Sequence, residues 1–257
     1  MIKYNNLITY PPAPILKHII ILYVFSAFYR RFKITLIMEK FVDIPKIFEI
    51  LESYYPTHVM QARYQGQPFK VLVACILSIR NLDEITFPVA DRLFQIADTP
   101  EDIVDLPIER LKAIIKPINF SESKAENIKK ISKIILEQLN GEVPATMEGL
   151  LAFYGVGRKT ANLVLSLGHN IPAIAVDTHV HKVTNRLGYV KTKTPEQTET
   201  ALKEKLPQPY WIKINPLFVT HGKQICKTGR PWCDICPIID YCNQIGVNPR
   251  KIVFKEA

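Results

Sequence analysis

The chain has 257 residues, 47% of them hydrophobic and 22% charged, a balance that fills a globular core and excludes a low-complexity chain. Its formal charge of +9 favours a polyanionic partner. Residues 1–37 hold five basic side chains and no acidic one, which leaves only +4 for the remainder. This mild excess fits a DNA-binding protein without requiring one.

Residues 1–37 differ in character from the rest of the chain. We expect them to be a leader that does not conform to the fold, produced by a misplaced start upstream of Met38. The apolar run Ile19–Phe28 is shorter than the roughly 20 residues of a membrane-spanning helix, so no stable membrane association is expected. A mitochondrial presequence and a membrane anchor remain as alternatives.

From Met38 onward the spacing of apolar residues is that of amphipathic helices, and no run alternates as a strand would. The chain is therefore predicted to be all-α. Pro68–Ile79 is almost wholly apolar and should form a central buried helix, with Cys75 packed inside it. Prolines at 88, 100, 107 and 117 should break the helices that follow. Helices are expected at Pro45–Tyr55, Pro68–Ile79, Phe87–Ala97, Asp102–Leu106, Glu109–Ile115, Ser123–Leu139, Met147–Phe153, Arg158–Leu167, Thr178–Leu187, Pro195–Leu206 and Tyr210–His221.

The turn Gly155-Val156-Gly157 separates two of these helices and precedes Arg158 and Lys159. Glycines let the backbone approach a ligand closely, and amides at a helix N-terminus suit a phosphate. Lys159 is either a general phosphate contact or a nucleophilic amine that attacks a sugar C1′. Burial, or the positive charge of Arg158, would favour the neutral amine that attack requires.

The helix that begins at Arg158 should present two different faces. Its packed face is expected to hold Ala161, Val164, Leu165 and Gly168, and its polar face Lys159, Asn162 and Ser166. Gly168 is also a candidate for the C′ residue that ends the helix.

Asp177 stands where the next helix should begin and is a good N-cap, a role worth about 1 kcal/mol. The same carboxylate can also face a cleft and stabilise positive charge that develops on a sugar ring. His179 and His181 lie two residues apart, which is not the spacing of a helical metal pair, so packing or hydrogen bonding is expected of them.

Four of the five cysteines fall within seventeen residues, with gaps of six, two and five. Such clustering points to a metal or an iron–sulfur cluster in a reducing compartment rather than to disulfides. A single C-x-x-C within one loop suits a [4Fe–4S] cluster held by Cys226, Cys233, Cys236 and Cys242; zinc or free thiols are the alternative. Lys227 and Arg230 give this loop a basic rim suited to a second phosphate.

Several motifs together resemble the endonuclease III branch of the helix-hairpin-helix DNA glycosylases. In the family's order they read SKAENI, GVGRKTAN, AVDTHVHKVTNRLG and C-x6-C-x2-C-x5-C, and the resemblance covers Met38 to Cys242. It implies two helical lobes with a DNA-binding cleft between them: a six-helix lobe at 61–171, and a second lobe of 38–60 plus 172–257 that carries a mainly structural [4Fe–4S] cluster.

The resemblance further implies a base excision repair enzyme whose partner is double-stranded DNA with damaged bases or abasic sites. Lys159 would displace an oxidised pyrimidine and form a Schiff base, and β-elimination would then nick the strand. Asp177 would support the positively charged step and help to activate Lys159. DNA contacts are expected at Arg80, Phe120, Gly155, Val156, Gly157, Arg158, Lys227 and Arg230.

Certain positions depart from the family pattern and leave the base preference open. Arg80 and Asn81 stand where many members have Gln and Thr, in the segment that fills the gap left by the extruded base. Asn119-Phe120-Ser121 replaces a G-x-Y, with Phe120 as a wedge between bases, and Phe153-Tyr154 replaces Leu-Pro.

Two other functions remain as alternatives, a mismatch-specific thymine glycosylase and a non-catalytic iron–sulfur DNA-binding protein. An adenine-removing glycosylase is disfavoured, because such enzymes generally lack the lysine and carry a further C-terminal domain. We expect a monomer without a small-molecule substrate, located in the cytoplasm with the nucleoid if the source is prokaryotic.

Overall fold

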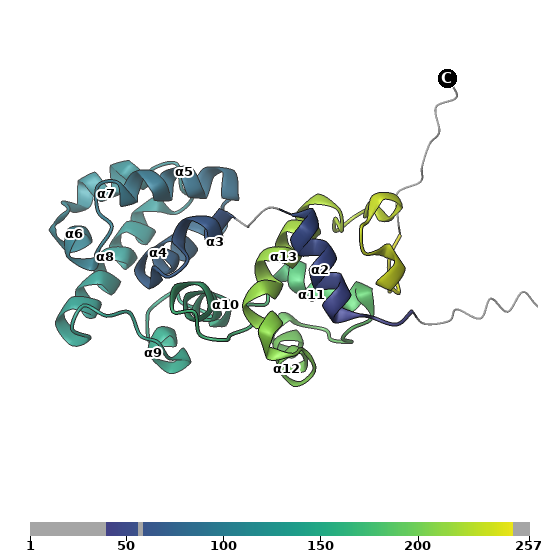
Figure 1. Ribbon diagram of the computed structural model, residues 1–257. Helices are drawn as coiled ribbons and strands as arrows, with labels where there is room; N and C mark the ends of the chain where they lie inside the picture. The colour runs from purple at the N-terminus through teal and green to yellow at the C-terminus, as the bar shows by residue number, and fades with distance from the viewer. Residues whose placement is uncertain (1–39, 56–58, 249–257) are drawn as a thin grey trace, which may run out of the picture. The chain divides into compact units, whose positions relative to one another are not determined.

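The computed structural model describes residues 40–55 and 59–248, and every regular element in these ranges is helical (Figure 1). The all-α prediction is therefore confirmed. The elements are α2 (Ile44–Tyr54), α3 (Val59–Tyr64), α4 (Pro68–Ser78), α5 (Asp83–Phe94), α6 (Pro100–Asp105), α7 (Ile108–Ile115), α8 (Ser121–Gln138), α9 (Met147–Leu151), α10 (Arg158–Leu163), η1 (Val164–Gly168), α11 (Thr178–Leu187), α12 (Pro195–Lys205), η2 (Gln208–Tyr210), α13 (Trp211–Gln224), η3 (Cys233–Ile235) and η4 (Ile239–Tyr241).

Contacts along the chain divide it into Met1–Glu39 and Lys40–Ala257. The leader expected at residues 1–37 lies outside the described residues, so that prediction stays open. Among the described helices, none has both the length and the apolar character needed to cross a membrane.

Capping residues set the starts of many helices. The side chains of Asp43, Thr99, Thr146 and Thr194 each accept a hydrogen bond from a first-turn amide of the helix that follows. Each such cap is worth about 1 kcal/mol. Helix α8 ends at Gln138, one residue before the predicted end, and the chain turns at Asn140 and Gly141, where the Gly141 amide, at φ +81°, donates to the Ile135 carbonyl at 2.9 Å.

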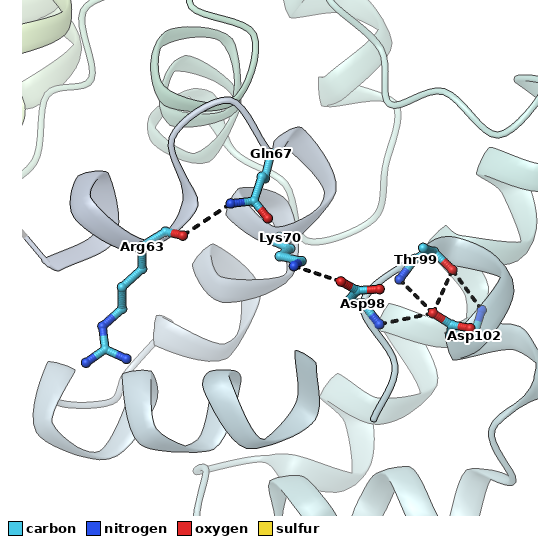
Figure 2. Close-up of polar contacts among 6 residues, drawn as sticks. All are labelled: Arg63, Gln67, Lys70, Asp98, Thr99 and Asp102. Atoms are coloured by element: carbon cyan, nitrogen blue, oxygen red, sulfur yellow. Dashed lines mark hydrogen bonds and ion pairs between the residues drawn. The ribbon is translucent and has the colours of Figure 1, made fainter. Parts of the chain in front are cut away.

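The start of α6 is tied to the start of α4 by a small polar network (Figure 2). The Asp102 carboxylate accepts hydrogen bonds from the Thr99 hydroxyl at 2.8 Å and from the Thr99 amide at 3.2 Å. Thr99 Oγ1 in turn accepts from the Asp102 amide, which completes a capping box. Lys70 of α4 forms an ion pair with Asp98 at 2.8 Å.

Two clusters of buried side chains hold the described chain together. One spans Met60 to Ala175 and is centred on α4, where Val71, Leu72 and Leu77 are fully buried. The other joins α2 to α11, α12 and α13 and includes Phe48 and Phe218. Helix α2, from the start of the described chain, thus lies against α13, from near its end (Figure 1). The division into lobes at the predicted bounds stays a prediction.

Ion pairs join helices of the two clusters at separate places. Lys223 of α13 pairs with Asp83 at the start of α5, and Arg158 of α10 pairs with Glu199 of α12. The Asn215 side-chain amide of α13 also donates to the Ala175 carbonyl at 2.9 Å. The last of these links holds the segment that follows η1 against α13.

Most predicted helices are confirmed to within a few residues, and the differences have local causes. Pro88 lies inside α5 rather than breaking it, because one lost backbone hydrogen bond is offset by the burial of Phe87, Val89, Ala90 and Leu93 on the same helix. Pro100 and Pro107 do mark helix starts. The sequence does not predict α3, whose six residues are too few to display a helical period.

Gly168 does not act as a left-handed C′ residue, so that prediction was wrong. It lies in the π-helical turn η1, which continues α10, and the chain leaves through His169 with an ordinary negative φ. Glycine is needed there because an added Cβ would lie 2.7 Å from the Pro68 Cα. The position is therefore determined by close packing of η1 on α4 and not by the end of a helix.

Candidate active site

The turn between α9 and α10 has the backbone geometry that the two glycines predict. Gly155 adopts φ +76°, in the left-handed region, and Gly157 is the extended N-cap of α10. The Asn127 side-chain amide steadies the turn by donating to the Tyr154 carbonyl at 3.0 Å. Amides in the first turn of α10 have no partner within the helix and remain available to an anion.

Val156 contributes to this turn differently from its glycine neighbours. Its side chain is buried in the first cluster, and its amide donates to the Phe153 carbonyl at 3.1 Å. Val156 therefore supports the turn from inside, and its predicted contact with a DNA phosphate stays a prediction.

Lys159 is exposed on α10, as predicted. Its ammonium lies close enough to Cys75 of α4 to oppose the effect of burial, which raises the pKa of that thiol to about 12. Burial was one of the two causes expected to favour a neutral Lys159 amine. Because the side chain is exposed, burial does not act on it. Within the described residues, no ion pair or hydrogen bond joins Lys159 to Asp177.

The positive charge of Arg158, which was expected to act on Lys159, is paired with the carboxylate of Glu199. Its Nη2 donates to Glu199 Oε1 at 2.6 Å and its Nε to Oε2 at 3.2 Å. Glu199 is only 4% exposed and also accepts from Lys203 at 2.7 Å. Burial raises the pKa of Glu199, but the hydrogen bonds from Arg158 and Lys203 outweigh it and leave the pKa below its ordinary value. Arg158 therefore fastens α10 to α12.

The polar face predicted for α10 is only partly present. Asn162 and Ser166 are 1% and 2% exposed, so both are buried rather than on the open side with Lys159. The Ser166 hydroxyl donates to the Leu163 carbonyl. Helices pack on both sides of this segment, and a two-face assignment from the sequence cannot detect the second neighbour.

Asp177 is the N-cap of α11, as predicted. One oxygen, Oδ1, accepts from the amides of His179 at 2.9 Å and of Val180 at 2.8 Å. No hydrogen bond within the described residues engages Oδ2. A partly buried carboxylate therefore keeps one oxygen for a second task while the other holds the helix start.

The two histidines of α11 pack and form hydrogen bonds, as expected. His181 Nδ1 lies 2.6 Å from the Thr198 hydroxyl. His179 packs so closely on Gly222 of α13 that a Cβ there would lie 2.7 Å from its Nδ1. Gly222 thus allows α13 to approach α11 directly behind the Asp177 cap.

Arg80 and Phe120, which are forty residues apart, are brought together. The guanidinium carbon of Arg80 lies 5.6 Å from the centre of the Phe120 ring, within the range of a cation–π contact. Both residues adopt left-handed backbone, at φ +56° and +61°, and Phe120 is 59% exposed. The sequence names both residues but does not predict that they touch.

All four clustered cysteines border one cavity. Burial raises the pKa of Cys236 to about 12 and that of Cys242 to about 11, so thiolates here need a positive partner such as bound metal. Within the described residues, no three His, Cys, Asp or Glu side chains are arranged to hold a single metal ion. A four-thiol lining around a shared space fits the donor set of an iron–sulfur cluster.

Further polar groups surround these thiols, and the sequence did not identify them. Arg186 Nη1 donates to Cys226 Sγ at 3.3 Å, and the Gln244 amide donates to Cys242 Sγ at 3.4 Å. His221 lies between the Tyr55 hydroxyl at 2.9 Å and Cys236 Sγ at 3.7 Å. Arg186 lies 40 residues before Cys226 and Tyr55 lies 181 residues before Cys236, so these two left no local signal, whereas Gln244 is only two residues from Cys242.

The two basic residues of the cysteine loop differ in their surroundings. Lys227 Nζ lies 3.7 Å from the centre of the Trp232 ring, and Arg230 is exposed. A separate cavity of about 780 Å³ is lined by the starts of α4 and α6, the chain after α8, and His169. It holds none of the predicted site residues.

Comparisons with known proteins agree with these features. Residues 73–208 match the family model described as HhH-GPD superfamily base excision DNA repair protein. Endonuclease III of Thermotoga maritima is 46% identical over 69% of this chain and 84% of its own length. Endonuclease III of Escherichia coli K12 is 40% identical over the same shares of the two chains.

Solved structures lead to the same family. A non-covalent endonuclease III–DNA complex and a trapped endonuclease III–DNA covalent intermediate each match with a TM-score of 0.69 and 33% identity, covering 78% of this chain and 94% of theirs. A thermostable thymine-DNA glycosylase also has a TM-score of 0.69, but its 22% identity shows a shared fold alone. The chain therefore belongs to the HhH-GPD superfamily of base excision DNA repair proteins and, within it, to the endonuclease III family.

Proposed function

We propose that this chain releases oxidised pyrimidines from duplex DNA and then nicks the strand at the abasic site, with Lys159 as the nucleophile. As a member of the endonuclease III family it is a DNA glycosylase and abasic-site lyase. The observation that supports the residue assignment is an exposed primary amine directly after the Gly155–Gly157 turn, in the first turn of α10.

In the proposed reaction the neutral Lys159 amine attacks C1′ of the damaged nucleotide. A C–N bond forms while the bond to the base breaks, and the base leaves with the electron pair and takes up a proton. Opening of the sugar ring gives a Schiff base. Loss of a proton from C2′ then drives cleavage of the C3′–O bond, and the 3′ phosphate leaves.

Asp177 is assigned to the charged stages of this sequence. Because Oδ1 is held by two amides of α11, Oδ2 is oriented without being neutralised. A carboxylate so placed accepts the proton lost from the attacking amine and stabilises positive charge on the sugar.

Binding of a DNA backbone phosphate is assigned to the amides at the start of α10. Gly155 and Gly157 carry no side chain that would obstruct a phosphate, and the helix N-terminus attracts negative charge. The Val156 amide donates to the Phe153 carbonyl and Arg158 donates to Glu199, so both shape the turn, and their contacts with DNA stay predictions. Arg230 and Lys227 remain proposed contacts beside the cysteine loop, and Arg80 and Phe120 at the lesion.

Cys226, Cys233, Cys236 and Cys242 are proposed to hold a [4Fe–4S] cluster, which would supply a structural centre for the last part of the chain. The donor set and the shared cavity support this assignment. The hydrogen bonds from Arg186 and the Gln244 amide would stabilise thiolate sulfur.

Borohydride trapping on a duplex with one abasic site tests the nucleophile. Wild-type protein should form a covalent adduct that Lys159→Ala abolishes. The matched control is Lys191→Ala, another exposed lysine, which should leave the adduct yield unchanged. An undiminished adduct in Lys159→Ala would reject the assignment.

A further inference from the structure

Two loops meet at the Arg80–Phe120 contact, and both are held in an unusual conformation. One follows α4 and the other joins α7 to α8. Each presents a residue other than glycine in the left-handed region, Arg80 at φ +56° and Phe120 at φ +61°. Such conformations persist only where surrounding contacts determine them, and they gather at functional sites.

Asn81 and Asn119 supply contacts that join the two loops. The Asn119 amide donates to Asn81 Oδ1 at 2.9 Å, and Asn119 Nδ2 donates to the Arg80 carbonyl at 2.9 Å. Asn81 Nδ2 in turn donates to the carbonyls of Leu77 at 2.9 Å and Ile79 at 3.0 Å. We call this pair the asparagine bracket.

A buried lysine of α8 forms hydrogen bonds with the same backbone carbonyls as the asparagine bracket. Lys124 of α8 is 7% exposed, and its Nζ donates to the same two carbonyls, Leu77 at 3.0 Å and Ile79 at 2.6 Å. The end of α4 therefore receives donors both from its own loop and from α8. The backbone on either side of Arg80 is thereby held by groups from three segments of the chain.

The two loops that the asparagine bracket joins expose apolar side chains and one arginine. Phe120 is 59% exposed, and Ile79 and Leu82, in the loop that holds Arg80, are 42% and 66% exposed. Arg80 adds a planar cation, and its guanidinium carbon lies 5.6 Å from the centre of the Phe120 ring. Aromatic and aliphatic side chains of this kind insert between base steps, and a guanidinium can form hydrogen bonds with an unpaired base.

We propose that Asn81 and Asn119 are positioning residues that make Arg80 and Phe120 act as one unit on the strand opposite the lesion, and so set the preference for the opposite base. The proposal rests on the glycosylase function proposed above. By the resemblance described for the sequence, Asn81 and Asn119 are two of the positions that depart from the family pattern. Glycine has no side-chain donor for the Arg80 carbonyl, so the two departures complement each other.

A double-mutant cycle tests this coupling. Asn81→Ala, Asn119→Ala and the double variant are compared for kcat/KM on a damaged-pyrimidine duplex with each of the four bases opposite. Each single variant should lower kcat/KM about tenfold, as expected for a lost hydrogen-bonded contact, and should reduce the spread among opposite bases. The double variant should be no worse than about threefold below either single one, since the bracket is already broken.

Three further measurements separate positioning from folding and from chemistry. Thermal unfolding should show that the variants remain folded. Fluorescence of 2-aminopurine opposite the lesion should reveal a loss of contact with the unpaired base. Gln95→Ala removes an exposed side-chain amide at the end of α5 and should change none of these readouts. A second variant, Asn81→Thr with Asn119→Gly, should alter the opposite-base preference while keeping the covalent adduct on abasic DNA.

Two outcomes would overturn the proposal. Independent, multiplicative losses in the double variant would show that the asparagines are not coupled. An unchanged opposite-base profile in folded variants would show that the bracket does not position the inserted pair. Failure of the proposed function itself would look different, because wild-type protein would then give no borohydride adduct at all.

Discussion

Arg158 and Glu199 form a two-pronged ion pair between α10 and α12, with donor–acceptor distances of 2.6 Å and 3.2 Å. Glu199 is buried and Arg158 is about half exposed, so the pair lies at the boundary between protein and solvent. It holds the start of α10, and hence Lys159, against the helices of the second cluster. Arg158, which adjoins the proposed nucleophile, thus acts on the position of Lys159.

Glu199→Gln is expected to destabilise the protein by about 1–3 kcal/mol. The amide accepts weaker hydrogen bonds than the carboxylate and leaves the charges of Arg158 and Lys203 without a counterion. Urea unfolding measures the change. Glu204→Gln, at an exposed position of the same helix, is the control and should cost less than about 0.5 kcal/mol. Equal losses in both variants would contradict the role assigned to the pair.

The capping role of Asp177 Oδ1 and the proposed catalytic role of Oδ2 are expected to respond differently to mutation. Asn is as good an N-cap as Asp, so Asp177→Asn should keep Oδ1 in place and change stability by less than about 0.5 kcal/mol. It should nevertheless lower the rate of base release by about 100-fold or more, because a neutral amide can neither accept a proton nor balance positive charge. Asp177→Ala should lose activity and also about 1 kcal/mol of stability. Single-turnover base release and thermal unfolding measure the two effects; an active Asp177→Asn would restrict the residue to capping.

Lys124 is expected to make stability depend on alkaline pH. Burial lowers its pKa from 10.5 to about 8 in the folded protein, so between these values the unfolded chain binds a proton that the folded chain does not. Stability from this residue should therefore rise as pH increases from about 8 to 10.5. Urea unfolding should be measured for wild-type protein and for Lys124→Met across this range. The free energy of unfolding of the wild type, relative to that of Lys124→Met, should increase as the pH rises. A parallel pH dependence in the two proteins would show that Lys124 does not titrate there.

Cys236→Ser is expected to lower the iron content of the purified protein, because it removes one of the four thiols that border the cavity. Cys75→Ser is the control: Cys75 lies in the other buried cluster, and its loss should leave iron unchanged. Iron and zinc per chain, measured by elemental analysis, check the result. Stoichiometric zinc without iron in the wild type would refute the cluster assignment.

The sequence by itself determined the helices and the chemical groups that depend on near neighbours. Apolar character placed α4 in the core, and the capping residue Asp177 marked the start of α11, because these interactions join residues a few positions apart. The order of neighbouring residues was also enough to predict that Lys159 is exposed at the start of α10 and that the four cysteines share one loop.

Only the tertiary structure decided which groups were already engaged with partners far along the chain. It buried Asn162 between packed helices and paired Arg158 with a carboxylate 41 residues away. It also joined Asn81 to Asn119 across 38 residues, which turned two isolated departures into one bracket. Such contacts depend on how helices pack against one another, and the periodicity of a single helix carries no record of its neighbours.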